Sequence, residues 1–186
     1  METISPVYAR LVLRELELRG IDPAPLFAGA SISLEELLRG GDIPMRDFLH
    51  ILRSGDRLLG TGQLGFVLGS KMNVLTMGPV GVAIAAAPNL REGVQVLESF
   101  TRLHATYIDI GARSTLRGIT VTILYRHDTG DLERFHTETA MLLLQQYIET
   151  LAGERIRDAH FRLAIREPKD SAAYKEALHG LSLIHI

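Results

Sequence analysis

Tyr107, Tyr125 and His136 are the residues of this sequence whose types and positions best suit the binding of a small ligand. The two tyrosines lie on a predicted β-hairpin, and His136 lies near the start of the long helix predicted to follow it. A sheet face covered by helices is a common place for a pocket with a few polar groups. We therefore expect these side chains to contact a ligand. The alternative is that they are aromatic groups at the edge of the core, with hydrogen-bonded polar atoms.

Two further patterns resemble parts of a dinucleotide site and of a metal site, but each lacks other features that such a site needs. Residues 60–65 match the dinucleotide pattern G-x-G-x-x-G. That site needs a strand before the glycines, whereas residues 47–59 have helical spacing, so we predict a turn between two helices. Glu133 and His136 would share one face of a helix, but carboxylate-bridged di-metal sites need this motif twice and further glutamates. We therefore predict no metal and no cofactor.

The other titratable residues form no catalytic pattern. The seven histidines lack the H-x-x-x-H spacing of a zinc site, no Gly-x-Ser-x-Gly motif is present, and there is no cysteine. We predict that the chain is not an enzyme. Arg113, Arg117 and Arg126 could attract an anion, but we expect them to form a solvated surface of the hairpin.

The composition is that of an ordinary globular protein. Of the 186 residues, 46% are hydrophobic and 23% are charged, and the net charge of −2 gives no strong electrostatic signature of nucleic-acid binding. No apolar run approaches the ~20 residues of a membrane helix. The first residues also lack the uninterrupted apolar segment of a secretory signal. These features predict one domain, located in the cytoplasm, with no membrane partner.

The hydrophobic periodicity predicts helices followed by a small sheet. Residues 78–104 should form two helices joined at residues 87–89, with residues 80–87 buried and Asn89 capping the second helix. Ser5 should cap the first helix, and residues 141–144 should be covered on most sides. In chain order, we predict helices over about 6–19, 33–40, 44–59, 63–69 and 78–104, strands over 107–110 and 119–125, a helix over 132–151, a strand over 159–165 and a helix after 170. The predicted fold class is α+β, predominantly helical, with a small β-sheet of about three strands packed against helices.

Several motifs occur in the order found in one known family. They are Ile43-Pro44-Met45, Leu64-Gly65-Phe66-x-Leu68-Gly69, Gly78-x-x-Gly81-x-Ala83, Ala87-Pro88-Asn89-Leu90-Arg91-Glu92, and Phe161-Arg162 with Pro168 and Tyr174. Over roughly residues 7–180, their order and spacing resemble the N-terminal, arabinose-binding-type regulatory domain of AraC-family bacterial transcription regulators. The sequence departs from the family pattern shortly before Pro168, where the family often has a histidine and this chain has Arg166.

The resemblance implies a function that the residues alone do not specify. Regulatory domains of this kind sense a small-molecule effector and often form a homodimer. They precede a C-terminal domain with two helix-turn-helix units, which this sequence lacks. We therefore predict that residues 1–180 are an effector-binding and dimerisation domain that reaches DNA only through the missing half. The alternative is a stand-alone domain that binds a small ligand or a protein and has no DNA partner.

The last six residues, 181–186, have an unusual possible origin. The codons CTG-TCT-CTT-ATA-CAC-ATC would encode them, and this string resembles a transposon end that is used as a sequencing adapter. We expect residues 181–186 to be a non-native, adapter-derived tail. The alternative is a genuine apolar terminal strand.

Overall fold

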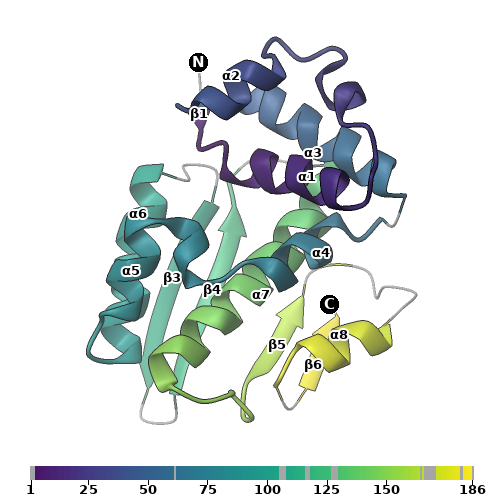
Figure 1. Ribbon diagram of the computed structural model, residues 1–186. Helices are drawn as coiled ribbons and strands as arrows, with labels where there is room; N and C mark the ends of the chain where they lie inside the picture. Colours follow the sequence, from purple (N-terminus) through teal and green to yellow (C-terminus); the bar gives the residue numbers. More distant parts are fainter. Residues whose placement is uncertain are drawn as a thin grey trace. The chain divides into compact units, whose positions relative to one another are not determined.

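The computed structural model describes residues 3–60, 62–104, 108–115, 118–126, 130–163, 165, 171–180 and 182–185 (Figure 1). The chain forms two compact units, Met1–Leu68 and Gly69–Ile186. Helices predominate, and the described strands form three separate pairs. The predicted α+β class is therefore confirmed. The extent of a single regulatory domain over residues 1–180 stays a prediction.

The first unit is built around α1 (Val7–Leu18) and α3 (Met45–Leu59). These helices approach closely at Gly55, where an added Cβ atom would lie 2.3 Å from Cγ1 of Val12. Tyr8 and Phe48 meet edge to face, with ring centroids 6.3 Å apart. A side chain larger than hydrogen at Gly55 would therefore force these two helices apart. The other elements of this unit are β1 (Thr3–Ile4), η1 (Ala24–Phe27), α2 (Leu34–Arg39), β2 (Ile43–Pro44), which pairs antiparallel with β1, and the start of α4 (Leu64–Lys71).

Local signals at the helix ends of the first unit were mostly predicted correctly. The capping box that begins α2 is present, because the Ser33 hydroxyl accepts from the Glu36 N–H at 3.2 Å and the Glu36 carboxylate accepts from the Ser33 N–H at 2.7 Å. Gly60 ends α3 with a φ of +66°, and α4 follows, so the glycines of residues 60–65 connect two helices as predicted. The predicted Ser5 cap is wrong. After the β1 strand, α1 begins at Val7, which is one residue later than predicted. Pro6 therefore occupies the cap position, and no side chain caps the helix.

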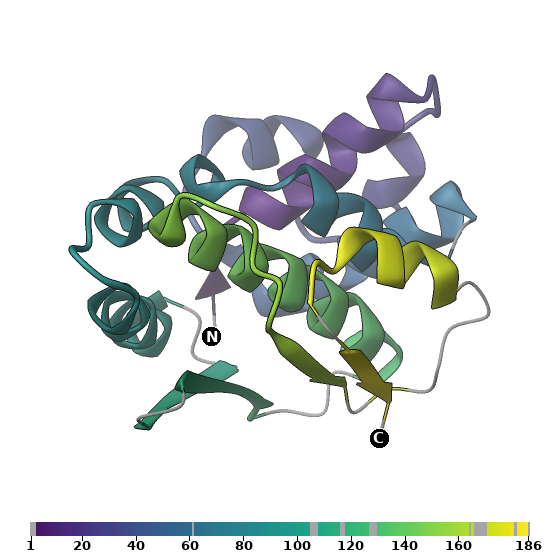
Figure 2. The ribbon, with the colours of Figure 1, turned by 90° about the horizontal axis from the view of Figure 1, so that it is seen from below.

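The central helix of the second unit is α7 (Glu133–Ala152). Seen from below in Figure 2, it has β3 (Ile108–Thr115), β4 (Gly118–Tyr125), α5 (Pro79–Ala85) and α6 (Leu90–His104) to one side, and β5 (His160–Leu163), α8 (Ser171–Ala177) and β6 (Ser182–His185) to the other. Residues 141–143 are buried and Leu144 is half-buried, which confirms that α7 is covered on most sides. Two short turns, η2 (Val74–Met77) and η3 (Gly130–Leu132), complete the unit. Among the described residues, no helix is both long and apolar enough to cross a membrane.

The strands of the second unit pair two by two. β3 and β4 form an antiparallel hairpin, and β5 pairs in parallel with β6. The strand predicted over residues 159–165 thus has a terminal strand as its partner. Residues 182–185 supply that strand, which is the conformation expected of a genuine apolar terminus. The adapter origin of residues 181–186 stays a prediction.

The helices predicted within residues 78–104 are confirmed as α5 and α6, but the predicted burial of residues 80–87 is wrong. The Asn89 side chain accepts from the Glu92 N–H at 3.0 Å, as expected of a cap. Within α5, however, the buried residues are Gly81 and Ile84, and Val82 is 54% exposed. Apolar composition shows that a helix can be buried, but the packing of η2, α6 and α7 decides which of its sides are covered.

Candidate functional site

The β3–β4 hairpin has one apolar face that is only partly covered. Along β4, Ile119, Val121, Ile123 and Tyr125 are half-buried, and the residues between them are exposed. The register places Ile108 of β3 directly opposite Tyr125, and directly opposed residues lie on the same face of an antiparallel pair. The sequence alternation of β4 therefore produces an apolar surface that is neither fully buried nor solvated.

Tyr125 and His136 lie close together at the end of this face. Their ring centroids are 5.7 Å apart with planes tilted by 42°, and the Phe135 ring stands edge-on to His136 at 5.0 Å. His136 is only 4% exposed, whereas Tyr125 is half-buried. Two of the three predicted ligand-binding residues are thus brought together by β4 and α7, and Tyr107 lies outside the described residues. Their role in binding stays a prediction.

The electrostatics of His136 favour a neutral ring. Burial lowers the pKa of His136 to about 4, because the charged imidazolium loses its hydration. The neutral imidazole has one N–H donor and one acceptor nitrogen. Together with the faces of Tyr125 and Phe135, it suits an apolar ligand that carries one hydrogen-bonding group.

The charged residues named in the sequence analysis do not extend the Tyr125–His136 pair into a metal or anion site among the described residues. Glu133 and His136 both lie in α7 at the predicted i, i+3 spacing, but Glu133 is exposed whereas His136 is buried. No group of three or more potential metal-ligating side chains occurs among the described residues. Arg126 pairs with Asp109 through two contacts of 2.7 and 2.5 Å, and Arg113 is exposed. Arg117 lies outside the described residues.

A polar cluster that was not predicted from the sequence lies next to His136, because Arg134 and Glu138 are each two residues away from it along α7. Arg134 donates to the Glu138 carboxylate at 2.6 Å and to the Tyr174 hydroxyl at 2.9 Å, and the Tyr174 hydroxyl also donates to Glu138. Glu138 and Tyr174 are 0% exposed, and burial is the main cause of the raised pKa of Tyr174. This cluster fastens α8 to α7. Its signal in the sequence is the oppositely charged pair Arg134 and Glu138 at i, i+4 in the first two turns of α7.

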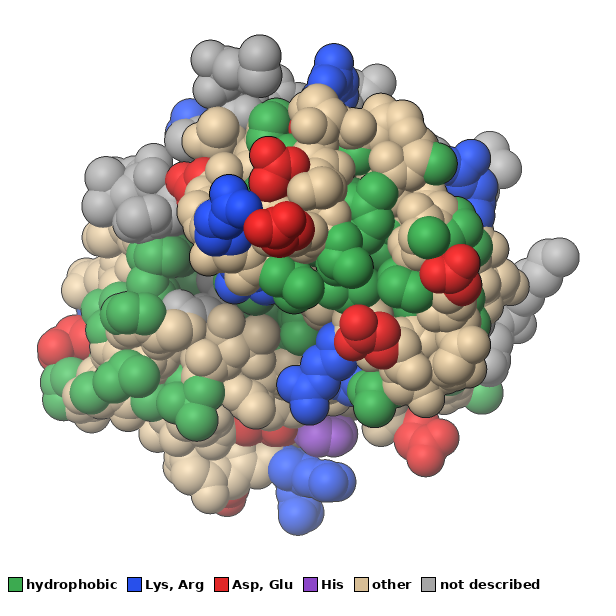
Figure 3. Space-filling model, turned by 45° about the horizontal axis from the view of Figure 1, so that its top comes forward, with side chains coloured by type: hydrophobic (Ala, Val, Ile, Leu, Met, Phe, Trp, Pro, Cys, Tyr) green, Lys and Arg blue, Asp and Glu red, His purple; other side chains and the backbone are tan. Residues whose placement is uncertain are grey.

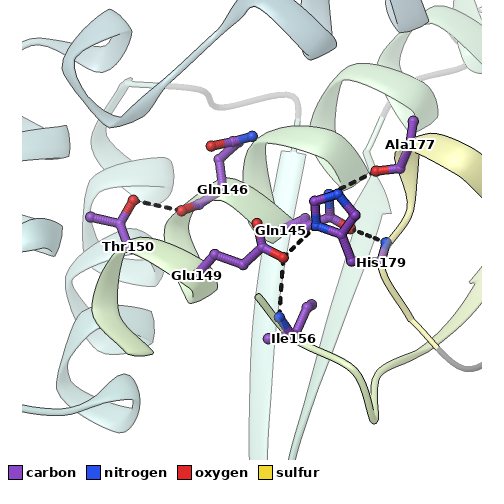
Figure 4. A network of polar contacts seen from close by, with 7 residues as sticks. All are labelled: Gln145, Gln146, Glu149, Thr150, Ile156, Ala177 and His179. Atoms are coloured by element: carbon purple, nitrogen blue, oxygen red, sulfur yellow. Dashed lines mark hydrogen bonds and ion pairs between the residues drawn. The ribbon is translucent and has the colours of Figure 1, made fainter. Parts of the chain in front are cut away.

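A second polar network fastens the residues after α8 to the other end of α7 (Figure 4). The Gln145 amide donates to the Ala177 carbonyl at 2.9 Å and accepts from the His179 N–H at 2.9 Å. The Glu149 carboxylate contacts Nδ1 of His179 at 2.6 Å and accepts from the Ile156 N–H at 3.1 Å. The middle of α8, at Tyr174, and its C-terminal end, at Ala177, are therefore both attached to α7.

Residues 20–180 match the model of a family described as the arabinose-binding domain of AraC transcription regulators, at the N-terminus. The chain belongs to this family. The match spans Tyr125 and His136 as well as the Arg134–Glu138–Tyr174 cluster, so the AraC-type domain contains the complete arrangement described above. The family is one of regulatory, ligand-binding domains of transcription regulators and not of enzymes.

One curated relative of this AraC-type domain is the ornithine utilization regulator of Pseudomonas aeruginosa. The two are 26% identical over 181 residues, which cover 94% of this chain and 52% of the relative. The chain thus spans about half the length of the relative.

Proposed function

We propose that this chain is the effector-sensing and dimerisation domain of an AraC-type transcription regulator, with its DNA-binding half outside the chain. The family match and the double length of the relative support this assignment. The observation that carries the sensing role is the contact of Tyr125 with a buried, neutral His136 at the end of a half-covered apolar face. Such a face can accept a small molecule without the loss of tightly packed contacts.

The proposed mechanism is a shift between two conformations of the domain. An effector that binds the hairpin and α7 in one conformation more tightly than in the other changes their populations. The shift can be no larger than this difference in affinity allows. Because α7 also holds α8, a displacement of α7 at the hairpin would change the position of the C-terminal segment. A DNA-binding half that follows this segment would then be presented differently to DNA.

The partners and location follow from the same assignment. The regulator would act in the cytoplasm as a homodimer and would contact DNA through two helix-turn-helix units of the missing half. This chain alone should not bind an operator. Sequence-specific DNA binding by the chain in a gel-shift assay would contradict the proposal.

The sensing role can be tested by thermal unfolding of the chain with added small molecules. Aromatic acids and fatty acids match the apolar face and are tested first, and L-ornithine and other amino acids are added because of the name of the relative. A compound present at about 100 times its Kd should add about 2.7 kcal/mol to the stability. Tyr125→Ala should abolish this gain, whereas Leu124→Ala, on the adjacent and exposed position of the same strand, should retain it. A gain that persists in Tyr125→Ala would place the effector elsewhere.

The complete gene distinguishes the proposal from a stand-alone binding domain. An open reading frame that continues into two helix-turn-helix motifs supports the regulator. A native stop codon near Gly180 would contradict it.

A further inference from the structure

An apolar surface on α5 and η2 has no covering in the described structure, and it differs from the other exposed apolar positions. Pro79, Val82, Ala83 and Ala86 follow helical spacing along one side of this segment, and all four are exposed. Leu75 of η2, which packs against α5, is 70% exposed. These five residues are called the α5 patch below. Figure 3 shows hydrophobic side chains gathered at the left of the view, where Figure 1 draws α5 and α6.

The α5 patch contains no charge. No lysine, arginine, histidine, aspartate or glutamate occurs between Lys71 and Arg91. The other large hydrophobic residues that are exposed among the described residues have charged neighbours: Leu18 lies between Glu17 and Arg19, Leu34 precedes Glu35, Leu38 precedes Arg39, and Leu124 lies beside the Arg126–Asp109 pair. The α5 patch is therefore distinguished from these positions by its lack of charge and not by its degree of exposure.

The patch is also held rigidly. A Cβ atom at Gly81 would lie 1.5 Å from the carbonyl oxygen of Val74, so the backbones of α5 and η2 are in direct contact. Leu75 and Val82 thus project from two turns that cannot move apart without loss of this packing. A rigid surface loses little conformational entropy when a partner binds.

We propose that the α5 patch is the surface through which two copies of this chain associate. In a twofold-symmetric contact, residues near the axis face their own copies, so any charge there would face a like charge. A charge-free surface meets this requirement. Its lack of cationic side chains does not suit nucleic acid, and the outer side of a helix is not the concave site that a small ligand needs. The inference rests on the homodimer included in the proposed function and identifies the face that forms it.

The test is the molar mass of the whole chain, measured by light scattering and sedimentation over a range of concentrations. The parent chain is expected to dimerise, and Val82→Glu is expected to weaken dimerisation by more than about 100-fold, because two carboxylates would meet across the axis. The matched control is Leu124→Glu, which places the same charge at an exposed position outside the α5 patch and should leave the dimer unchanged. An equimolar mixture of Val82→Glu and Val82→Lys should recover a dimer, because opposite charges would then face each other.

Circular dichroism and thermal unfolding at low concentration should show that these variants remain folded. A parent chain that stays monomeric contradicts the proposed face and the homodimer, but not effector sensing, which the Tyr125→Ala test addresses separately. If the Val82→Glu chain still dimerises, the α5 patch is not the dimer interface, but the homodimer itself is not contradicted. A folded Val82→Glu monomer with a greatly reduced unfolding temperature would show that the patch is covered within one chain, and this result too would overturn the inference.

Discussion

The elements on the two sides of α7 differ in how completely they are buried and in how their polar groups are paired. Toward the C-terminus, Glu138, Tyr174 and Gln145 are almost completely buried, and each makes at least two hydrogen bonds or an ion pair. Toward the hairpin, the contact consists of half-buried apolar side chains, with Tyr125 against a neutral His136.

From this difference we expect the C-terminal side to attach α8 to α7 and the hairpin side to bind the ligand. Paired polar groups in a buried place are costly to break, so the C-terminal side should keep α8 in a fixed position on α7. A half-covered apolar face has few contacts to lose, and such regions open locally at a low cost in free energy. Ligand-dependent change should therefore begin at the hairpin, and α7 should carry it to α8.

Glu138→Ala should have the largest effect on stability. The substitution removes the acceptor shared by Arg134 and the buried Tyr174 hydroxyl, and breaking a buried charged pair is strongly destabilising. Because the Arg134 side chain is 36% exposed and can regain water, we expect a loss of about 3 kcal/mol rather than the upper end of the range. Urea unfolding measures this loss. Glu133→Ala, at an exposed position of the same helix, should change the stability by less than about 0.5 kcal/mol, and equal losses would contradict the comparison.

Acidification tests the hairpin side. His136 has a pKa of about 4 in the folded chain and near 6.5 when unfolded, so the unfolded state binds more protons between these values and stability falls as the pH decreases. Between pH 7 and pH 5 this contribution should lower the stability by about 2 kcal/mol. His136→Gln removes the titrating group, and urea unfolding of both proteins should show a smaller decrease for the variant. A decrease of the same size in both would mean that His136 is not desolvated.

Tyr174→Phe tests how much of the attachment depends on one hydroxyl group. The ring remains buried, but its hydrogen bonds with Arg134 and Glu138 are lost, and we expect a loss of about 1 kcal/mol. Denaturant unfolding is again the measurement. A loss smaller than that of Tyr125→Phe would reverse the contrast between the two sides.

Tyr125→Phe should have the smallest effect on stability. The hydroxyl belongs to a half-buried residue on the loosely covered face, so we expect a change within about 0.5 kcal/mol. The same variant should weaken binding of any effector that hydrogen-bonds to the hydroxyl, and calorimetry on the parent and the variant separates the two effects.

The sequence predicted the features that depend on local patterns. The capping box at Ser33, the helix cap at Asn89 and the covered residues 141–144 follow from short spacings, and the structure confirms them. Features set by packing were missed or wrong. Tyr174 is 36 residues from Glu138 along the chain, and no local pattern indicates their contact. The burial of α5 was predicted wrongly for a related reason, because composition does not reveal what covers a helix.

Part of the candidate site was also predictable. The alternation along β4 placed Tyr125 on the inner face, and the position of His136 at the start of α7 brought it near the strand end. Two features of the site could not be predicted, because they depend on tertiary packing. They are the contact of Phe135 with His136 and the 5.7 Å distance between the ring centroids of Tyr125 and His136. Tyr107 adds nothing to this comparison, because it lies outside the described residues.

Hydrogen–deuterium exchange with a co-purified effector tests the central claim most directly. The chain is purified from its source cell, any bound small molecule is identified by native mass spectrometry, and exchange is compared with and without that molecule. Slower exchange is expected over residues 118–126 and 130–140 when the molecule is bound, with a smaller change over residues 171–177. Protection confined to residues 3–60, with the hairpin and α7 unchanged, would contradict the central claim.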